Sequence, residues 1–255
     1  MKKRFLKYSL IGLLFFILGC TRPSADAQFR IAQLLVTNSP VTIKMVKDGA
    51  PAFTDQLSYG TLGNYEKIAA GKYRIQIFRD KQLILDKKIG LAHNGKYSIY
   101  LYGLPIENKS NNASTLENTL HTIAEGEEAN DTNDYLPKLK ILNDIFYGDT
   151  TKAKIRWIHT APGVEKLKGH LLSTATKDSN IVNTLDYPKQ SKYYPVIPGE
   201  HEIFWSLGSE ERIVARANVT LQPKTIYTFF IVPQRMQFID SLQVLTAITT
   251  AHKPN

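Results

Sequence analysis

The chain lacks several features that would identify a class of protein at once. It has 255 residues but a single cysteine, so no disulfide can form within it and the fold must rest on its hydrophobic core. Its basic residues are scattered, so the net charge of +9 does not indicate a nucleic-acid partner. The 43% hydrophobic and 22% charged content is ordinary for a globular chain of one or two domains, which excludes a fibrous or wholly disordered protein.

Motifs of common catalytic and metal sites are also missing. The histidines form no HxH or HExxH motif, and the chain has no GxSxG and no phosphate-binding glycine motif. We therefore expect no catalytic residue, no metal and no cofactor. His159, beside Pro162, is either a general base or a structural histidine at the end of a strand. An envelope hydrolase is kept as an alternative interpretation.

The first twenty residues, MKKRFLKYSLIGLLFFILGC, differ from the rest of the chain. A basic start is followed by an uncharged apolar run, Tyr8 to Gly19, which is shorter than the roughly 20 residues that cross a bilayer as a helix. This build predicts a secretory signal peptide over residues 1–19. Its removal would leave a chain that starts at Cys20 and lies outside the cytoplasm.

The end of this segment, FILGC, resembles the lipobox of bacterial lipoproteins, although Ile17 stands where the family usually has leucine. The small residue that the family requires before the cysteine is present as Gly19. The resemblance implies a lipid on Cys20, an outer-membrane anchor and a tether over residues 20–27. The membrane is thus an expected partner. The tether has only Asp26 as an acidic residue, which favours the periplasmic face, and the cell surface stays open.

Two stretches of the chain repeat each other at an offset of 128: LSYGTLGNYEKIAAGKYRIQI from Leu57, and LDYPKQSKYYPVIPGEHEIFW from Leu185. Three further blocks align in the same order. They are 91–102 with 221–232 at offset 130, 139–145 with 242–248 at offset 103, and 36–41 with 158–163 at offset 122. A period this long indicates a duplicated domain rather than a solenoid. We place the two copies at residues 28–149 and 150–251.

The repeated segments alternate in period 2 and are rich in β-branched and aromatic residues, as in YRIQIF, YSIYLY, KIRWIH, HEIFW and IYTFFIV. Such short strands between turn signals predict an all-β fold with two tandem sandwich domains. Gly71 and Gly199 each precede a strand, where we expect a turn with positive φ or a close backbone approach. His201 replaces Tyr73 of the other copy, which indicates a packing position.

The first copy carries a polar, acidic insertion at about residues 104–136 that the second copy lacks. We expect a surface loop there. Three apolar residues in it, Leu116, Leu120 and Ile123, have the spacing of a short helix. Its acidic residues are either calcium ligands or solvated charges, and the spacing of an EF-hand is missing. They are Glu125, Glu127, Glu128, Asp131 and Asp134.

The repeated blocks resemble domain-of-unknown-function family 4397. The matching elements are Tyr59, Gly60 and Tyr65, the glycine turn after them, and the stretches IRWIHTAPG and KYSIYLYG. The resemblance implies immunoglobulin-like β-sandwich domains, often in tandem, on secreted proteins and lipoproteins. The family has no established activity. The second copy departs at Tyr187-Pro188, and the first has Thr37 to Pro40 in place of the His-x-x-Pro that starts at His159.

The strand KYSIYLYG has apolar residues on both faces. Tyr97, Ile99 and Leu101 share one face, whereas Tyr100 and Tyr102 share the other. Either neighbouring structure, including the other domain, covers both faces, or the tyrosines form a contact surface for a glycan or a protein. We expect a non-catalytic binding or structural role in the cell envelope, with an envelope protein or a glycan as partner. A carbohydrate-binding surface lipoprotein is the alternative.

Overall fold

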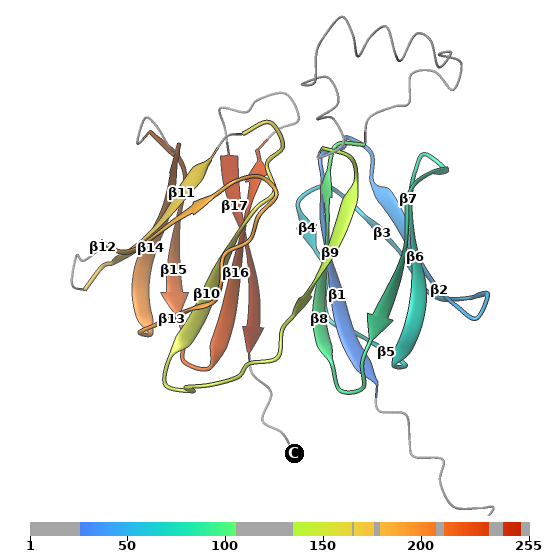
Figure 1. Ribbon diagram of the computed structural model, residues 1–255, viewed down its shortest axis with the longest axis horizontal. Coiled ribbons are helices and arrows are strands. Elements are labelled where there is room, and N and C mark those ends of the chain that lie inside the picture. The colour runs from blue at the N-terminus through green and yellow to red at the C-terminus, as the bar shows by residue number, and fades with distance from the viewer. Residues whose placement is uncertain are drawn as a thin grey trace, which may run out of the picture.

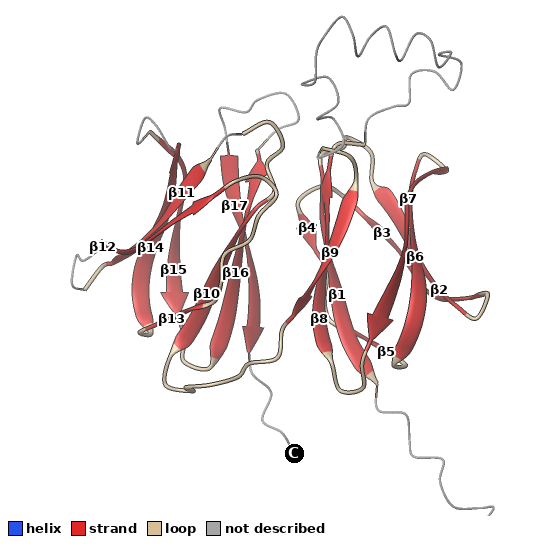
Figure 2. Ribbon diagram, in the orientation of Figure 1, coloured by secondary structure: helices blue, strands red, loops and turns tan. Residues whose placement is uncertain are grey.

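The computed structural model describes residues 26–105, 135–164, 166–175, 179–207, 212–234 and 242–250. All regular secondary structure within these ranges is β-strand, as Figure 2 shows. No helix in this part of the chain is long and apolar enough to cross a membrane. The predicted signal peptide and Cys20 lie outside the described residues. So do residues 106–134, which hold the predicted short helix and acidic cluster.

Nine strands of the first domain lie within the described residues. They are β1 (Ala27–Leu35), β2 (Val41–Lys47), β3 (Ala50–Leu57), β4 (Thr61–Leu62), β5 (Glu66–Ile68), β6 (Gly71–Arg79), β7 (Gln82–Leu91), β8 (Lys96–Gly103) and β9 (Lys138–Asn143). One sheet has the order β4-β1-β8-β9, with β5 also paired to β1, and the other has the order β3-β2-β6-β7. The first strand thus starts one residue before the predicted start of the domain.

In the second domain the described part of the chain forms eight strands. They are β10 (Ala153–His159), β11 (Leu167–Ser173), β12 (Ser179–Leu185), β13 (Tyr194–Val196), β14 (Gly199–Leu207), β15 (Ile213–Leu221), β16 (Thr225–Pro233) and β17 (Leu242–Thr250). Their sheets have the orders β13-β10-β16-β17 and β12-β11-β14-β15. In both domains the first strand pairs in parallel with the strand that follows the second sheet. The predicted all-β fold with two tandem sandwich domains is confirmed.

Each sandwich buries its own apolar core, because its strands alternate between inward and outward side chains. In β6 the inward residues Tyr73, Ile75 and Ile77 belong to the core of the first domain. In the second domain the indole rings of Trp157 and Trp205 meet edge to face, with centroids 5.7 Å apart. The two cores are separate clusters of residues.

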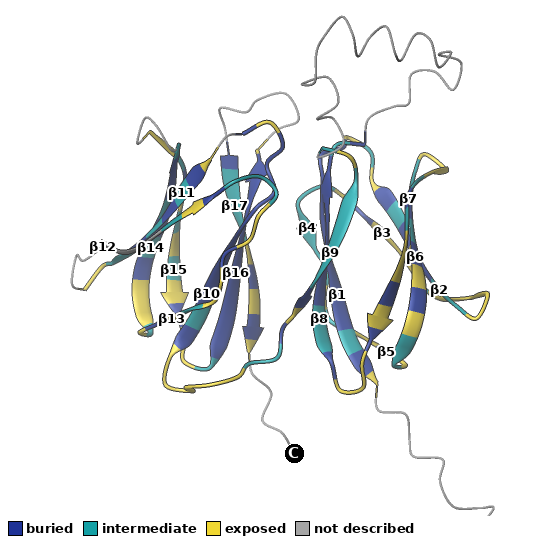
Figure 3. Cartoon of the chain, viewed as in Figure 1, coloured by how far each residue is buried: buried dark blue, intermediate teal, exposed yellow. Residues whose placement is uncertain are grey.

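The sheets that contain β1 and β10 face each other in the middle of the molecule (Figure 1). Their central strands are buried on both faces, and β16 is buried at every position (Figure 3). In β8, Ile99 and Leu101 face the core of the first domain, whereas Tyr100 and Tyr102 face the second domain. The interpretation in which the other domain covers the second face of this strand is confirmed.

Two turn glycines and one histidine have the structural roles that the sequence predicts. Gly71 and Gly199 begin β6 and β14 with φ of +153° and +138°, a region that other residues rarely adopt. His201 is buried, and its Nε2 lies 2.9 Å from the carbonyl oxygen of Ile197. In the other copy the Tyr73 hydroxyl donates to a carbonyl four residues before it. Position 201 is therefore a packing position.

The strand pairing corrects the front alignment of the two copies. The registers of β1 with β8 and of β10 with β16 align Arg30 with Arg156, an offset of 126 rather than 122. His159 therefore corresponds to Gln33, not to Thr37. Both side chains are fully buried, and each accepts a hydrogen bond from the backbone N–H two residues further on.

The last strands of the two domains are also shifted from the sequence alignment. The registers of β9 with β8 and of β17 with β16 align Asn143 with Ile248, an offset of 105 rather than 103. Asp144 therefore corresponds to Thr249. Apolar residues recur every second position in a strand, so a shift of two keeps every side chain on its face and the sequence pattern does not reveal it.

Candidate functional site

The candidate site is the interface between the two domains. A cluster of buried apolar residues fills its centre and belongs to neither core. In it the Tyr100 ring packs against Tyr102 and Phe230, with centroid distances of 5.4 and 5.5 Å. The cluster consists of Ala32, Leu34, Tyr100, Tyr102, Leu142, Ile158, Phe230, Val232 and Ala247. Shared apolar packing of this kind joins the two sandwiches into one body.

The prediction that Tyr100 and Tyr102 form an open contact surface is wrong for this arrangement of the domains. Their exposed fractions are 1% and 2%. The second domain covers both rings. The outward face of β8 is as apolar as its inward face, so removing it from water stabilises the folded chain. A glycan has no access to these rings while the domains are packed together.

A small cavity lies at one side of this interface. It has a volume of about 60 Å³ and is lined mainly by apolar side chains, including Leu62, Phe230 and Leu245. Pockets for small organic ligands usually have volumes of about 300–1,000 Å³. The cavity is therefore a packing defect between the domains rather than a place for a sugar or a cofactor.

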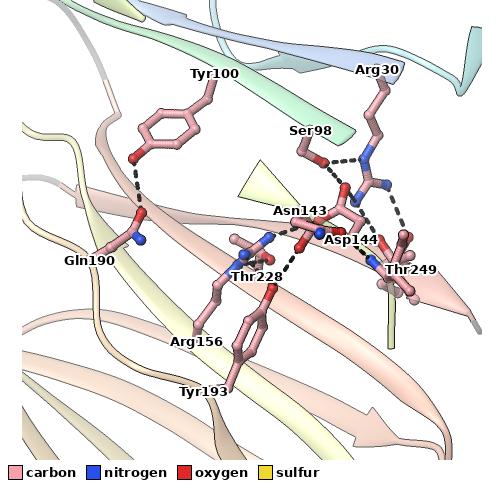
Figure 4. Close-up of polar contacts among 12 residues, drawn as sticks. Arg30, Ser98, Tyr100, Asn143, Asp144, Arg156, Gln190, Tyr193, Thr228 and Thr249 are labelled. Atoms are coloured by element: carbon pink, nitrogen blue, oxygen red, sulfur yellow. Dashed lines mark hydrogen bonds and ion pairs between the residues drawn. The ribbon is translucent and has the colours of Figure 1, made fainter. Parts of the chain in front are cut away.

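Asp144 is the polar centre of the interface (Figure 4). It follows β9, and its side chain is fully buried. Its carboxylate accepts hydrogen bonds from the Ser98 hydroxyl at 2.5 Å, from the Tyr65 hydroxyl at 2.7 Å and from the Arg156 guanidinium at 2.8 Å. The Arg30 guanidinium lies 3.9 Å from the same carboxylate. One buried carboxylate thus connects cations from both domains.

The two arginines occupy matching positions and make matching contacts within their own domains. Each donates through Nε to a hydroxyl on the neighbouring strand at 2.8 Å, Arg30 to Ser98 and Arg156 to Thr228. Each guanidinium also lies over a tyrosine ring of its own domain, at 4.4 Å for Arg30 and 4.7 Å for Arg156. Both side chains are almost completely buried.

Each arginine also reaches the end of the last strand of the other domain. Arg30 donates to the Ile248 carbonyl oxygen at 2.9 Å and to the Thr249 hydroxyl at 2.8 Å, whereas Arg156 donates to Asp144. Because Thr249 corresponds to Asp144, the interface has an approximate twofold relation, like that of a symmetric homodimer. The two halves of the interface differ in charge, since only the first domain supplies a carboxylate at this position.

The repeated tyrosines line the same interface. The Tyr59 hydroxyl donates to the Pro233 carbonyl oxygen at 2.7 Å, and Tyr65 bonds to Asp144 and Thr249. In the second copy the Tyr193 hydroxyl donates to the backbone carbonyl of the first domain at position 143, at 3.0 Å. The motif that suggested a family resemblance therefore builds the contact between the two copies.

Burial gives the interface a pH dependence. It raises the pKa of the hydroxyls of Tyr59, Tyr65 and Tyr100, and at Tyr65 the charge of Asp144 adds to this effect. Because the folded pKa lies above the ordinary value of about 10, the stability these groups contribute is present below pH 10 and is lost as the pH rises through the raised pKa.

We therefore expect the urea midpoint of unfolding to fall as the pH rises above about 10, together with the appearance of tyrosinate absorbance. The lysines of the chain also titrate in this range, so the matched control is Tyr59→Phe combined with Tyr65→Phe. This variant should show a smaller decrease. Tyrosinate that appears at its ordinary pKa in the folded protein, with no loss of stability, would contradict the expectation.

The described histidines have structural contacts. The Nε2 of His159 lies 3.2 Å from the Val164 carbonyl oxygen, and this side chain is fully buried. The His170 ring stacks on Phe204 at 4.5 Å, and its Nε2 lies 3.1 Å from the Ser206 hydroxyl. Among the described residues no group of three or more His, Cys, Asp or Glu side chains could hold a metal ion.

Sequence reasoning missed the three buried charged residues of the interface. Arg30, Asp144 and Arg156 stood among many ordinary charges in the chain. The available signal was an arginine at the same place in two mainly apolar strand segments, FRIAQLL and IRWIHTA. An alignment at offset 126 would have paired Arg30 with Arg156. It would have indicated two buried guanidiniums, which need an anionic partner.

Comparison with known proteins leaves the family open. No family model and no curated protein matches the chain. Solved structures that match the chain include a "putative cell adhesion protein" from Bacteroides ovatus and another from Bacteroides eggerthii. The first is 7% identical, with 92% of this chain and 100% of that chain covered and a TM-score of 0.24. The second is 10% identical, with 91% and 98% covered and a TM-score of 0.25.

The Bacillus anthracis TIE protein is 7% identical over 87% of this chain, with a TM-score of 0.26. The chain spans about a third of that protein, since 34% of its length is covered. TM-scores this low carry no argument about what the chain binds or does.

Proposed function

We propose that the chain is a lipid-anchored protein of the cell envelope of a Gram-negative bacterium, with a non-catalytic binding or structural role. The observation that carries the role is the interface between the domains. Buried charges, tyrosine hydroxyls and an apolar cluster join the two sandwiches, so they act as one stiff body rather than as two linked modules.

The stiff body separates two ends. The chain enters β1 at Ala27 at one end, and β8 runs parallel to β1, so Gly103 lies at the opposite end. There the backbone N–H of Leu104 donates to the Tyr135 carbonyl oxygen, which brings together the two flanks of the insertion. With a lipid on Cys20, the body would hold these flanks away from the membrane. We propose that an envelope protein or a glycan is contacted at this distal end.

The carbohydrate-binding and hydrolase alternatives lose the residues on which they rested. Tyr100 and Tyr102 are covered by the second domain. His159 is buried in contacts with nearby backbone. We also propose that the two copies belong to domain-of-unknown-function family 4397, on the strength of the motif around Tyr59 and Tyr65.

The anchor is tested by labelling cells with a fatty-acid analogue and separating membranes from soluble protein. The native chain should carry the label and sediment with the outer membrane, whereas Cys20→Ser should lose both properties. Protease added to intact and to lysed cells then decides between surface and periplasm. Crosslinking of the native chain should capture a stable partner. A native chain that stays soluble and unlabelled would refute the anchor.

A further inference from the structure

The large apolar side chains that are most exposed gather at one end of the body. Among the described residues they are Ile197, Tyr147 and Ile248, with exposed fractions of 74%, 64% and 51%. Ile197 lies in the turn before β14, Tyr147 in the linker between β9 and β10, and Ile248 near the end of β17. One exposed isoleucine is ordinary, but several large exposed apolar side chains at one end of a protein indicate a contact surface.

This end is the one from which the tether leaves. β9 runs antiparallel to β8 and therefore ends near the start of β1, so the linker with Tyr147 lies there. β17 ends at the same place, because Arg30, the fourth residue of β1, bonds to Ile248 and Thr249. Figure 1 shows this linker and the end of β17 at the bottom of the molecule, beside the start of β1.

The length of chain between Cys20 and β1 limits how far this end lies from a lipid on Cys20. Residues 20–26 span at most about 25 Å when fully extended, at about 3.3–3.6 Å per residue. A nine-residue strand is about 30 Å long, so the opposite end of the body is further away when the strands point away from the bilayer. A lipid on Cys20 thus brings Ile197, Tyr147 and Ile248 within reach of the bilayer.

The charges of this end are compatible with lipid headgroups. Lysines stand at the turns and strand ends around the apolar residues, and acidic residues stand among them. The lysines include Lys47, Lys67, Lys72, Lys96, Lys152, Lys154 and Lys224, and the acidic residues include Asp26, Asp48, Glu66, Asp149 and Glu200. Tyrosine and aliphatic side chains beside lysines are common where proteins meet the headgroup region of a bilayer.

We propose that the tether end of the body is a membrane-contact surface, in which Ile197, Tyr147 and Ile248 insert into the headgroup region of the bilayer that holds the lipid anchor. The surface sets the direction of the strands relative to the membrane and keeps the distal end pointed away from it. This inference rests on the anchor proposed above, because a single weak contact without a lipid would not hold the protein on a bilayer.

The test uses the single-cysteine character of the chain. With Cys20 acylated, a cysteine introduced by Ile197→Cys or Tyr147→Cys is the only free thiol and takes one environment-sensitive fluorophore. Matched controls are Leu83→Cys and Ile213→Cys, because these side chains are 45% and 44% exposed and lie at the opposite end. The lipidated proteins are reconstituted in vesicles of phosphatidylethanolamine and phosphatidylglycerol that contain a spin-labelled lipid.

We expect the fluorophore at positions 147 and 197 to lose most of its emission to the spin-labelled lipid, and the fluorophore at positions 83 and 213 to keep it. Flotation of the vesicles separates the two proposals. Protein that fails to float shows that the anchor is wrong. Protein that floats, but has equal quenching at the two ends or no quenching, overturns the membrane-contact surface and leaves the anchor in place.

Discussion

Replacing Asp144 by alanine should lower the free energy of unfolding by about 3–5 kcal/mol, the usual loss when one partner of a buried ion pair is removed. The carboxylate accepts hydrogen bonds from Ser98, Tyr65 and Arg156, and its side chain has no exposure to water. Without it, the Arg156 guanidinium and the hydroxyls of Ser98 and Tyr65 lose an acceptor, and the buried Arg30 guanidinium loses a counter-charge 3.9 Å away. Urea unfolding followed by the fluorescence of Trp157 and Trp205 measures the change.

A surface carboxylate provides the matched control. Asp186 lies 3.9 Å from Lys166 and from Lys189, and its side chain is about half exposed. Because solvent screens such pairs, Asp186→Ala should cost about 1 kcal/mol or less. Asp144→Asn keeps the shape of the side chain but places an amide among donors, so most of the loss should remain. If Asp144→Ala costs no more than Asp186→Ala, the buried network does not hold the domains together.

The strands were predictable because their signal is local. Alternation in YRIQIF, KIRWIH and HEIFW follows from the pleat of a strand, and β6, β10 and β14 contain these segments. The repeat also predicted two copies of one sandwich, because a duplicated core pattern requires a duplicated core. Gly71 and Gly199 were predictable for the same reason, since glycine is the residue that most easily adopts positive φ at a turn.

The contact between the domains was only half predictable. The sequence shows that both faces of β8 are apolar, which implies a cover on each face, but the residues that supply the cover lie far along the chain. The sequence therefore favours an interface at Tyr100 but leaves a contact surface for a glycan or a protein as an alternative. Burial decides between the two, and burial depends on Phe230 and its neighbours in the other copy.

The charged centre was not predictable from the alignment that the apolar residues favoured. Shifts of two residues at the last strands and of four at the first preserve the faces of the strands, so the apolar pattern tolerates them. Only the polar residues distinguish the correct alignment of the two copies from the shifted ones. When Arg30 is aligned with Arg156 and Asp144 with Thr249, each copy supplies one half of the same contact between the domains.

Replacing Tyr100 by alanine should cost about 3–5 kcal/mol of unfolding free energy, the range for large aromatic side chains removed from well-packed sites. The ring is 1% exposed and contacts Tyr102 on its own strand and Phe230 across the interface. Its removal leaves a void between two domains that cannot close without moving both. Tyr100→Phe keeps the ring and loses only a hydrogen bond to Gln190 of 3.3 Å, so it should cost about 1 kcal/mol or less.

Tyr147→Ala is the control for a tyrosine in water, because that side chain is 64% exposed, and it should change stability by about 0.5 kcal/mol or less.

The same variants separate the interface from a contact surface. An interface predicts that Tyr100→Ala loosens the body, seen as faster proteolysis of the linker between β9 and β10, whereas Tyr100→Phe does not. A Tyr100→Ala protein that keeps its stability and protease resistance would contradict the interface and indicate that Tyr100 lies on an open contact surface.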